Sequence, residues 1–380
     1  MLHTLRVVLA LAGMVLASVS GAMAAEPILI GVPVIFTGPG AFVGEAEKNT
    51  LEMLGEALNA KGGIEGRPLK FIYYDTEGKP DVAVRLFKRL IEKDKVTAIL
   101  GPTASWEAGP VKPIAEKEKM PTIMLASARA IIDPVARWVF KTPVEDRIVV
   151  ARLLSHIKSA GLDQIALVTS QDGFGDGGRK EILEQAPEHG IKVVFDERYT
   201  MEDADLTPLL NKLKKTEAKA VVNWSSSRAP IVFAMNYKQV GLTLPHFQSH
   251  ASLSRSFLAA TGANSEGIVV AGPKFEGGEF LPDGDPQKKI IADYKAAYKA
   301  KWGKDANQFG AGAHDAFMIL TAALRKAGTD PEKLRAAIEE TRGYIGIGGV
   351  YTYSATNHGG LAKDSVVMYR ATGGGWQLLK

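Results

Sequence analysis

The feature that most constrains the fold of this sequence is a strand–helix–strand pattern between residues 96 and 130. The apolar run from Val96 to Leu100 predicts a strand, a helix is expected to begin near Ser105 after a Gly-Pro pair, and Thr122 to Leu125 predicts a second strand. If these strands are parallel, their carboxyl ends lie at one edge of a sheet, where open α/β folds bind ligands. Small residues at that edge would let a ligand reach backbone N–H groups. They are Thr103, Ala104, Ser105, Ala126, Ser127 and Ala128.

The same alternation of strands and helices runs through most of the chain. The first part has predicted strands at 28–33 and 69–74 and predicted helices at 44–59 and 81–93, and a new round begins with a helix at 146–159. This pattern predicts an α/β fold of two doubly wound parallel-sheet lobes. The later predicted segments are strands at 164–170, 192–196, 220–223, 246–249, 267–271 and 366–370 and helices at 175–189, 206–216, 230–240, 287–301, 308–327 and 331–341.

The two rounds of alternation are separated at 134–143, where Trp138 to Pro143 interrupts the rhythm. The late helices need a sheet to cover and the first lobe has an uncovered flank, so the chain is expected to return to that lobe. We predict one lobe from residues 25–143 plus 274–350 and a second from residues 144–273 plus 351–380. Two lobes joined by several crossings form a hinge with a crevice between them.

Residues 1–24 have the pattern of a cleavable export signal. Arg6 supplies a positive charge, the apolar run ends near Val19, and Ala22-Met23-Ala24 predicts cleavage near Ala24. A membrane anchor would need about 20 apolar residues, which is longer than this run. The sequence has no cysteine, which excludes disulfides, thiolate metal sites and a lipid-modified cysteine. We therefore expect the mature protein to be free in a periplasm.

The composition is that of an ordinary globular protein of about two domains. The chain has 380 residues, of which 46% are hydrophobic and 23% are charged. Its 46 Lys and Arg against 42 Asp and Glu give a net charge of +4, which is too balanced to indicate a nucleic-acid partner.

One motif suggests an enzyme, but its context argues against that interpretation. Gly173 to Gly178 fits G-x-G-x-x-G after a predicted strand, and Asp196 follows at the end of the next strand, as in a dinucleotide fingerprint. However, two residues intervene after the strand, Phe174 would crowd a pyrophosphate, and an exported protein has little access to NAD. The seven histidines are dispersed without ligand spacing, and no other catalytic motif is present. We therefore predict no enzyme activity, no cofactor and no metal site, and a glycine-rich loop that opens a helix.

A set of residues at the predicted strand ends is a better candidate for a functional site. Each of them alone is more often a core or surface residue than a ligand contact. Together they lie where the carboxyl ends of both sheets should face each other. They are Phe42, Ser105, Ala126, Phe174, Trp224, Ser226 and His250.

Several short stretches occur together along the chain. They are T-G-P-G-A at 37–41, N-A-K-G-G-I-E-G-R-P-L at 59–69, I-L-G-P-T-A-S at 99–105, D-G-F-G at 172–175 and K-Q-V-G-L at 238–242. In this combination, over nearly the whole mature chain, the sequence resembles the type I periplasmic binding proteins of ABC importers, specifically the leucine/isoleucine/valine-binding family. The resemblance implies a binding protein that captures its ligand by closure of two lobes and passes it to a membrane permease.

The resemblance also implies roles for single residues. The ligand carboxylate would be held at Ser105, Ala126 and Ala128, and aromatic walls would be formed by Phe174, Phe309 and Phe42 or Val43. The acid that holds the ligand's ammonium group in amino-acid binders falls on His250, so the usual acid is missing. Arg129 and Arg228 are expected near the crevice, and Arg129 is counted among the candidate contacts.

The missing acid decides the ligand that we expect. An ammonium group without a carboxylate loses a charge-assisted bond worth about 1.5–3 kcal/mol and keeps its desolvation cost. His250 would instead donate to an anion or a carbonyl oxygen, or carry positive charge. We therefore expect a small carboxylic acid, aromatic or 2-oxo, bound by a monomer that works with an ABC permease. The alternatives are a branched-chain or other aliphatic amino acid, a sensor lobe, a transcriptional regulator and an NAD-dependent enzyme.

Overall fold

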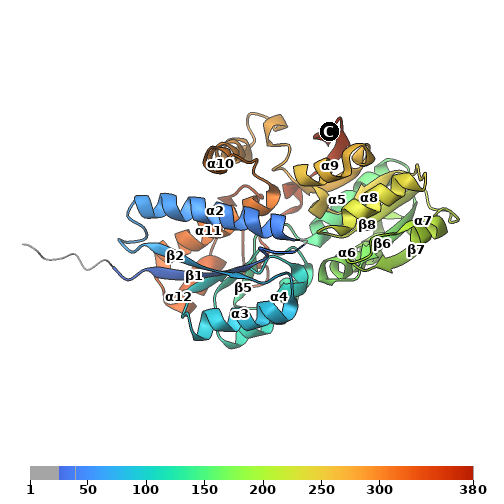
Figure 1. Cartoon of the computed structure of the whole chain (residues 1–380). Helices are drawn as coiled ribbons and strands as arrows, with labels where there is room; N and C mark the ends of the chain where they lie inside the picture. Colours follow the sequence, from blue (N-terminus) through green and yellow to red (C-terminus); the bar gives the residue numbers. More distant parts are fainter. Residues whose placement is uncertain (1–24, 39, 380) are drawn as a thin grey trace, which may run out of the picture.

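The computed structural model describes residues 25–38 and 40–379, and the predicted signal at 1–24 lies outside these residues. Two lobes lie side by side, each with its own sheet (Figure 1). The first sheet has five strands, all parallel, in the order β2-β1-β3-β4-β5. Its strands are β1 (Ile28–Val34), β2 (Leu69–Asp75), β3 (Ala98–Leu100), β4 (Thr122–Met124) and β5 (Val139–Lys141).

The second sheet has seven strands in the order β14-β13-β10-β9-β8-β6-β7. The five strands from β10 to β7 are parallel, whereas β13 pairs antiparallel with β10 and β14 pairs antiparallel with β13. The two-lobed α/β class is confirmed, and the antiparallel edge of the second sheet corrects the expectation of a purely parallel one. The strands are β6 (Gln164–Ser170), β7 (Lys192–Tyr199), β8 (Ala220–Trp224), β9 (His246–Gln248), β10 (Val269–Pro273), β13 (Val366–Thr372) and β14 (Gly375–Leu379).

Helices cover both sheets and most begin where the alternation predicts them. For example, α3 buries Val82, Phe87 and Leu90 on one face, as the apolar spacing indicates. The helices are α2 (Ala41–Ala60), α3 (Pro80–Glu92), α4 (Ser105–Lys117), α5 (Asp146–Ser159), α6 (Gly173–Gln185), α7 (Thr207–Leu213), α8 (Ala229–Gln239), α9 (Arg255–Thr261), α10 (Pro286–Trp302), α11 (Gln308–Ala327) and α12 (Pro331–Glu339).

Short elements account for the segments that the sequence pattern did not identify. Strand β5 lies inside 134–143, which we interpreted as a break in the alternation, and β14, α9 and the small hairpin of β11 (Tyr344–Ile345) and β12 (Val350–Tyr351) were also missed. Three of these strands have two or three residues, too few to show a period. Burial in the fold, and not local pattern, makes β5 a strand.

The chain passes between the lobes at three places: after β5, after β10 and before β13. Between the second and third passages, α11 packs against α2 and covers the first sheet (Figure 1). The hydroxyl groups of Tyr351 and Tyr353 donate to the backbone carbonyls of Thr142 and Lys141. We propose that the first lobe consists of residues 25–143 plus 274–350 and the second of residues 144–273 plus 351–380. The two tyrosine bonds favour placing residues 351–353 with the first lobe.

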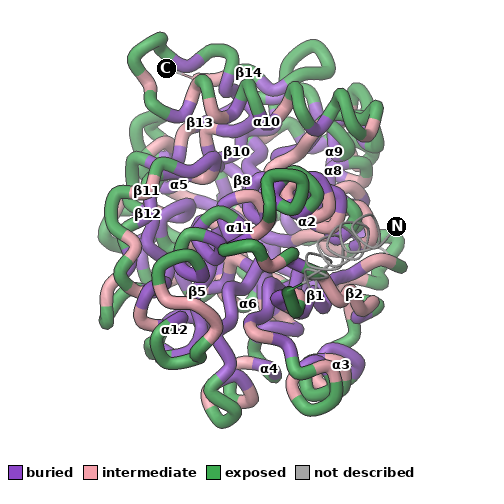
Figure 2. Tube along the Cα trace, turned by 90° about the vertical axis from the view of Figure 1, so that its left-hand side faces the viewer, coloured by how far each residue is buried: buried purple, intermediate pink, exposed green. Residues whose placement is uncertain are grey.

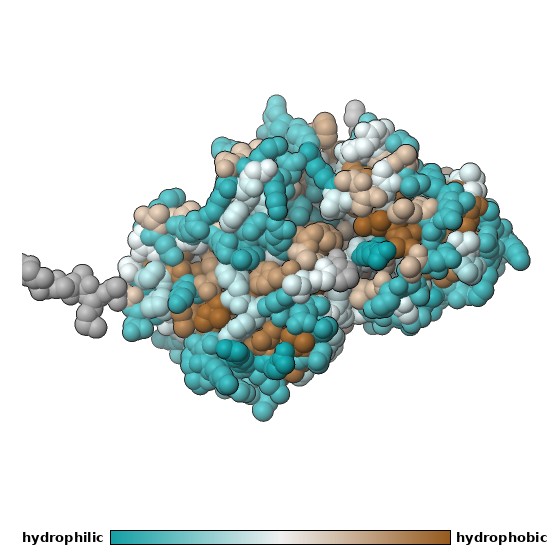
Figure 3. Space-filling model, in the orientation of Figure 1, coloured by the Kyte–Doolittle hydropathy of each residue, from teal (hydrophilic) through white to brown (hydrophobic). Residues whose placement is uncertain are grey.

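The strands and the helix faces that touch them form the buried interior of the molecule (Figure 2). Hydrophilic residues cover most of the face in Figure 3, and hydrophobic residues gather in a few smaller areas. Among residues 25–38 and 40–379, no helix is both long and apolar enough to cross a membrane.

Candidate functional site

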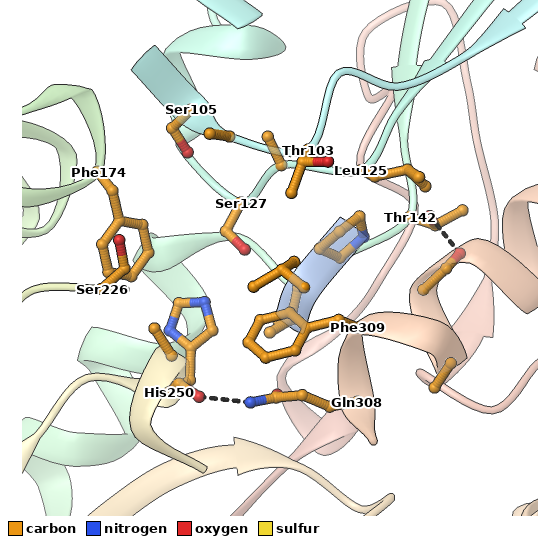
Figure 4. A pocket seen from close by; sticks show the side chains of 18 of the residues that line it. Thr103, Ser105, Leu125, Ser127, Thr142, Phe174, Ser226, His250, Gln308 and Phe309 are labelled. Carbon is orange, nitrogen blue, oxygen red and sulfur yellow. Dashed lines mark hydrogen bonds between the residues drawn. The ribbon is translucent and has the colours of Figure 1, made fainter. Parts of the chain in front are cut away.

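A pocket lies between the lobes, at the carboxyl ends of the parallel strands of both sheets (Figure 4). It encloses about 950 Å³, including its open mouth. We call its two sides the lobe 1 edge and the lobe 2 edge. The lobe 1 edge consists of Ile35, Thr103 to Trp106, Leu125 to Ser127 and Thr142 to Val144, and the lobe 2 edge consists of Phe174, Ser226, Ser227, His250, Ala251 and Pro273. This position agrees with the rule for ligand sites in open α/β sheets.

Ser105 gives the lobe 1 edge a hydroxyl group that can donate to a ligand. It is the first residue of α4, and the Glu107 carboxylate accepts from the backbone N–H of Ala104 at 3.2 Å to cap this helix. The Ser105 Oγ atom accepts from the backbone N–H of Ala128 at 3.1 Å. No described residue accepts from the Ser105 hydroxyl hydrogen, so it remains available to a ligand oxygen.

The hydroxyl of Thr103, on the same edge, already has hydrogen-bond partners. Its Oγ1 atom donates to the Glu47 carboxylate at 2.6 Å and accepts from the Ile35 N–H at 3.3 Å. Burial raises the pKa of Glu47 well above its ordinary value. Thr103 therefore connects the pocket wall to α2 and offers little to a ligand.

A buried lysine lies directly behind the lobe 1 edge. Lys141 has no exposed surface, and its Nζ atom donates to the carbonyl of Ser127 at 2.9 Å and to that of Pro143 at 2.8 Å. The Asp146 carboxylate is also fully buried and has no hydrogen bond in the described structure. Burial lowers the pKa of Lys141 and raises the pKa of Asp146, and the attraction between their charges opposes both shifts.

The bulkiest groups of the lobe 2 edge are the rings of Phe174 and His250. Phe174 stacks on Trp224 with 5.9 Å between ring centres, and it meets His250 edge to face at 5.3 Å. On the other side of the pocket mouth, Phe42 of α2 meets Phe309 of α11 edge to face at 5.7 Å. In Figure 4, the side chains of Phe309 and His250 lie opposite those of Thr103 and Ser105.

The glycine-rich run at 173–178 serves packing in this wall. The Asp172 carboxylate caps α6 by accepting from the N–H groups of Phe174 and Gly175 at 2.7 and 3.0 Å. A Cβ atom at Gly178 would lie 2.0 Å from the Trp224 indole nitrogen, so only glycine leaves room for that ring. The run forms the first turns of α6 itself, which corrects the expectation of a loop before the helix.

His250 faces the pocket as a neutral imidazole. Burial, with a smaller contribution from the charge of Lys141, lowers the pKa of His250 to about 3. Neither ring nitrogen has a hydrogen-bond partner among the described residues. A neutral imidazole ring has one N–H donor and one acceptor nitrogen. His250 can therefore donate to a ligand oxygen, and the structure does not support the positively charged state that we also expected.

A hydrogen-bonded link crosses the crevice beside His250. The Gln308 side chain, at the first residue of α11, donates to the carbonyls of His250 at 2.7 Å and of Leu253 at 2.8 Å (Figure 4 draws the first of these bonds). Nearby, Arg255 of α9 pairs with Asp305 at 3.0 Å, and both side chains are exposed. The structure is therefore that of a closed crevice.

Seven of the ten predicted site residues line the pocket: Phe42, Ser105, Ala126, Phe174, Ser226, His250 and Phe309. The other three lie outside it, which corrects their expected position. The Ala128 N–H is taken by Ser105, Trp224 lies behind Phe174, and Arg129 pairs with Asp133 at 2.6 Å and with the buried Glu181 at 3.1 Å. Their predicted roles in ligand binding remain untested.

Several lining residues were missed by sequence reasoning. Thr142 follows β5, which the pattern did not reveal, while Gln308 precedes the predicted Phe309 and could have been found as a polar residue at a helix start. Phe275 and Tyr351 come from passages between the lobes. No charged residue lines the pocket, and within the described part of the chain no three His, Cys, Asp or Glu side chains are close enough to hold a metal ion.

Comparison with known proteins decides the family. The periplasmic binding protein family matches residues 27–375. The chain belongs to this family. The resemblance to the leucine/isoleucine/valine-binding group of type I periplasmic binding proteins is thereby confirmed, and so is the expectation of a solute-binding protein in place of an enzyme.

Two curated relatives are similar to this chain over most of its length. The leucine-, isoleucine-, valine-, threonine- and alanine-binding protein of Pseudomonas aeruginosa is 28% identical over 334 residues, which make up 84% of each chain. The Leu/Ile/Val-binding protein of Escherichia coli K12 is 25% identical over 331 residues, or 85% of this chain and 86% of the relative.

Solved structures share the fold along nearly the whole chain. An extracellular ligand-binding receptor from Rhodopseudomonas palustris HaA2 superposes with a TM-score of 0.88 at 25% identity, covering 93% of this chain and 99% of the receptor. A leucine-binding protein from Thermotoga maritima superposes with a TM-score of 0.83 at 22% identity over 93% and 98% of the two chains, and shows the fold alone.

Proposed function

We propose that this periplasmic binding protein is the exported solute-binding component of an ABC importer and that it captures a small apolar carboxylic acid in the crevice. The observation that carries the proposal is the pocket at the strand ends of both sheets, which no charged side chain of the described residues lines and into which Ser105 can donate a hydroxyl hydrogen. Cleavage of residues 1–24, a periplasmic location, a monomeric state and delivery to an inner-membrane permease belong to the same proposal.

The ligand would act by shifting a conformational equilibrium, without any covalent change. It would bind first to the lobe 1 edge, and contacts with the lobe 2 edge would then favour the closed form. A ligand shifts this equilibrium only by its greater affinity for the closed form. The permease would recognise the closed form.

An aliphatic amino acid of the branched-chain class is the first candidate ligand. The relatives from Pseudomonas aeruginosa and Escherichia coli are named for binding leucine, isoleucine and valine. The apolar side chains of Val43, Leu125 and Val144 in the pocket suit a branched aliphatic group. The relatives favour this ligand over the aromatic or 2-oxo acid that the sequence led us to expect.

A carboxylic acid without an amino group is the second candidate, and one observation favours it. No carboxylate from residues 25–38 or 40–379 lines the pocket, and the residue that takes the place of the family's acid is the neutral His250. An ammonium group would lose water there without gaining an opposite charge. A 2-oxo acid would instead accept from the imidazole N–H through its carbonyl oxygen.

Calorimetric titration of the mature chain, residues 25–380, tests the proposal. Leucine and 4-methyl-2-oxopentanoate differ only in the amino or oxo group, and benzoate tests the aromatic class. Tight binding of leucine alone supports the first candidate, and tight binding of either other acid without leucine supports the second. Binding of none of these acids, together with native mass spectrometry that finds a bound non-acidic ligand, would refute the carboxylate proposal.

A further inference from the structure

Lys141 is a buried positive charge beside the pocket, although it does not line the pocket. It is the last residue of β5, and both carbonyls that it binds belong to lining residues, Ser127 and Pro143. Its ammonium group therefore lies one peptide unit behind the surface that a ligand would touch.

One peptide unit joins this ammonium group to the Ser105 hydroxyl. The carbonyl oxygen of the Ser127–Ala128 peptide accepts from Lys141 Nζ at 2.9 Å, and the N–H of the same peptide donates to Ser105 Oγ at 3.1 Å. The Ser105 hydroxyl hydrogen is the next donor in line. All donors in this chain point the same way, from the buried ammonium group toward the pocket.

We propose that Lys141 is a positioning residue that, through the Ser127–Ala128 peptide, makes the Ser105 hydroxyl a strong donor and sets the preference of the pocket for carboxylates over neutral ligands. This inference rests on the proposed function, because it requires the carboxylate of the ligand to bind at Ser105. It assigns the selection for negative charge to a residue that never touches the ligand.

The physical basis is the mutual polarisation of hydrogen bonds in a chain. A cation at one end polarises the carbonyl, which makes the attached N–H a stronger donor and in turn makes the hydroxyl a stronger donor, by about 10–30% per bond. Water and salt do not screen this effect where the groups are buried, and both Lys141 and Ser105 are buried. A ligand carboxylate gains more from a polarised hydroxyl than a neutral carbonyl group does.

A titration of matched acids and amides tests the selectivity. We expect Lys141→Met to lower the affinity for leucine by about tenfold and the affinity for leucinamide by about twofold or less. The same difference is expected between 4-methyl-2-oxopentanoate and its amide. In a Ser105→Ala background, Lys141→Met should have no further effect on the acids. Equal losses for acid and amide, or additive losses in the double variant, would overturn the proposal.

Two further measurements keep the test independent of folding defects and of ligand identity. Lys141→Met leaves the buried Asp146 without a positive charge nearby, so a Lys141→Met/Asp146→Asn variant, which removes both charges, should show the same loss of selectivity. In the ligand-free protein, the Ala128 amide should exchange with solvent about tenfold faster in both variants than in the wild type. Unchanged exchange at Ala128 refutes the relay, whereas a wild type that binds no acid refutes the proposed function.

Discussion

The two edges of the pocket present different chemical groups to a ligand. The lobe 1 edge presents mostly small and aliphatic side chains, backbone groups, the hydroxyl groups of Ser105 and Ser127 and the indole of Trp106, and Lys141 and the cap of α4 support it from behind. The lobe 2 edge presents the rings of Phe174 and His250, which are positioned by packing against Trp224. Small groups with fixed hydrogen bonds suit a part that all ligands share, and bulky rings suit the part that distinguishes them.

This difference teaches where variation in ligand choice can arise. A change at the lobe 1 edge should alter the affinity for all carboxylates together. A change at the lobe 2 edge should alter the ratio between ligands. The following substitutions, from the largest expected effect to the smallest, test this division.

Ser105→Ala should lower the affinity for every acid ligand by about 10- to 100-fold, because a hydrogen bond to the carboxylate is lost. Calorimetry with leucine, 4-methyl-2-oxopentanoate and benzoate measures the loss for each. Ser265→Ala is the matched control, since it removes an equally buried hydroxyl that lies outside the pocket, and it should leave the affinities unchanged. A loss confined to one of the acids would break the assignment of the lobe 1 edge to the shared carboxylate.

His250→Asp should raise the affinity ratio of leucine to 4-methyl-2-oxopentanoate by about tenfold, because it supplies a charge to the ammonium group. Titration of both ligands gives the ratio directly. His250→Asn, which is polar but uncharged, should leave the ratio within about twofold. If Asp and Asn change the ratio equally, the side chain at 250 does not select between amino and oxo groups.

Gln308→Ala should weaken all ligands by about fivefold, because its two bonds to the lobe 2 backbone form only when the crevice is closed. Small-angle scattering with saturating ligand should still show closure, while the midpoint of the transition moves to higher ligand concentration. An effect on one ligand only would place Gln308 among the selecting residues.

Arg255→Ala should change the affinities by about twofold or less. The Arg255–Asp305 pair also joins the two lobes, but both side chains are exposed, and exposed ion pairs contribute little. The same titrations at low and high salt check this. An effect as large as that of Gln308→Ala would show that surface charge, and not the buried link, controls closure.

The sequence was sufficient to predict long elements and the position of the site. Strand β6 and helices α5 and α11 begin and end at the predicted residues, because long periodic segments carry a clear signal. Phe174, which follows β6, could be placed at a strand end for the same reason, whereas Ser105 and His250 follow the three-residue strands β3 and β9 and were placed by the alternation of strands and helices around them. No local pattern pointed to Lys141, because its burial and its two carbonyl partners depend on β5, a strand of three residues.

Three predicted residues, Ala128, Trp224 and Arg129, lie outside the pocket for a related reason. A strand end fixes the neighbourhood of a residue but not the direction of its side chain. Trp224 is the last residue of β8, and its indole ring packs against Gly178. Arg129 follows Ala128 in the chain, and its guanidinium group pairs with Glu181. Only packing between distant segments decides such directions.

The segment that crosses between the lobes after β5 affects how the open protein first binds a ligand. Pro143 lines the pocket, accepts a bond from Lys141 and lies where the chain leaves the first sheet. Rotation of the second lobe about this segment would leave Ser105, Ser127 and Lys141 in place relative to one another. We therefore expect the open protein to keep the proposed carboxylate site fully assembled, so that the rate of capture depends on diffusion and the lifetime of the complex depends on closure.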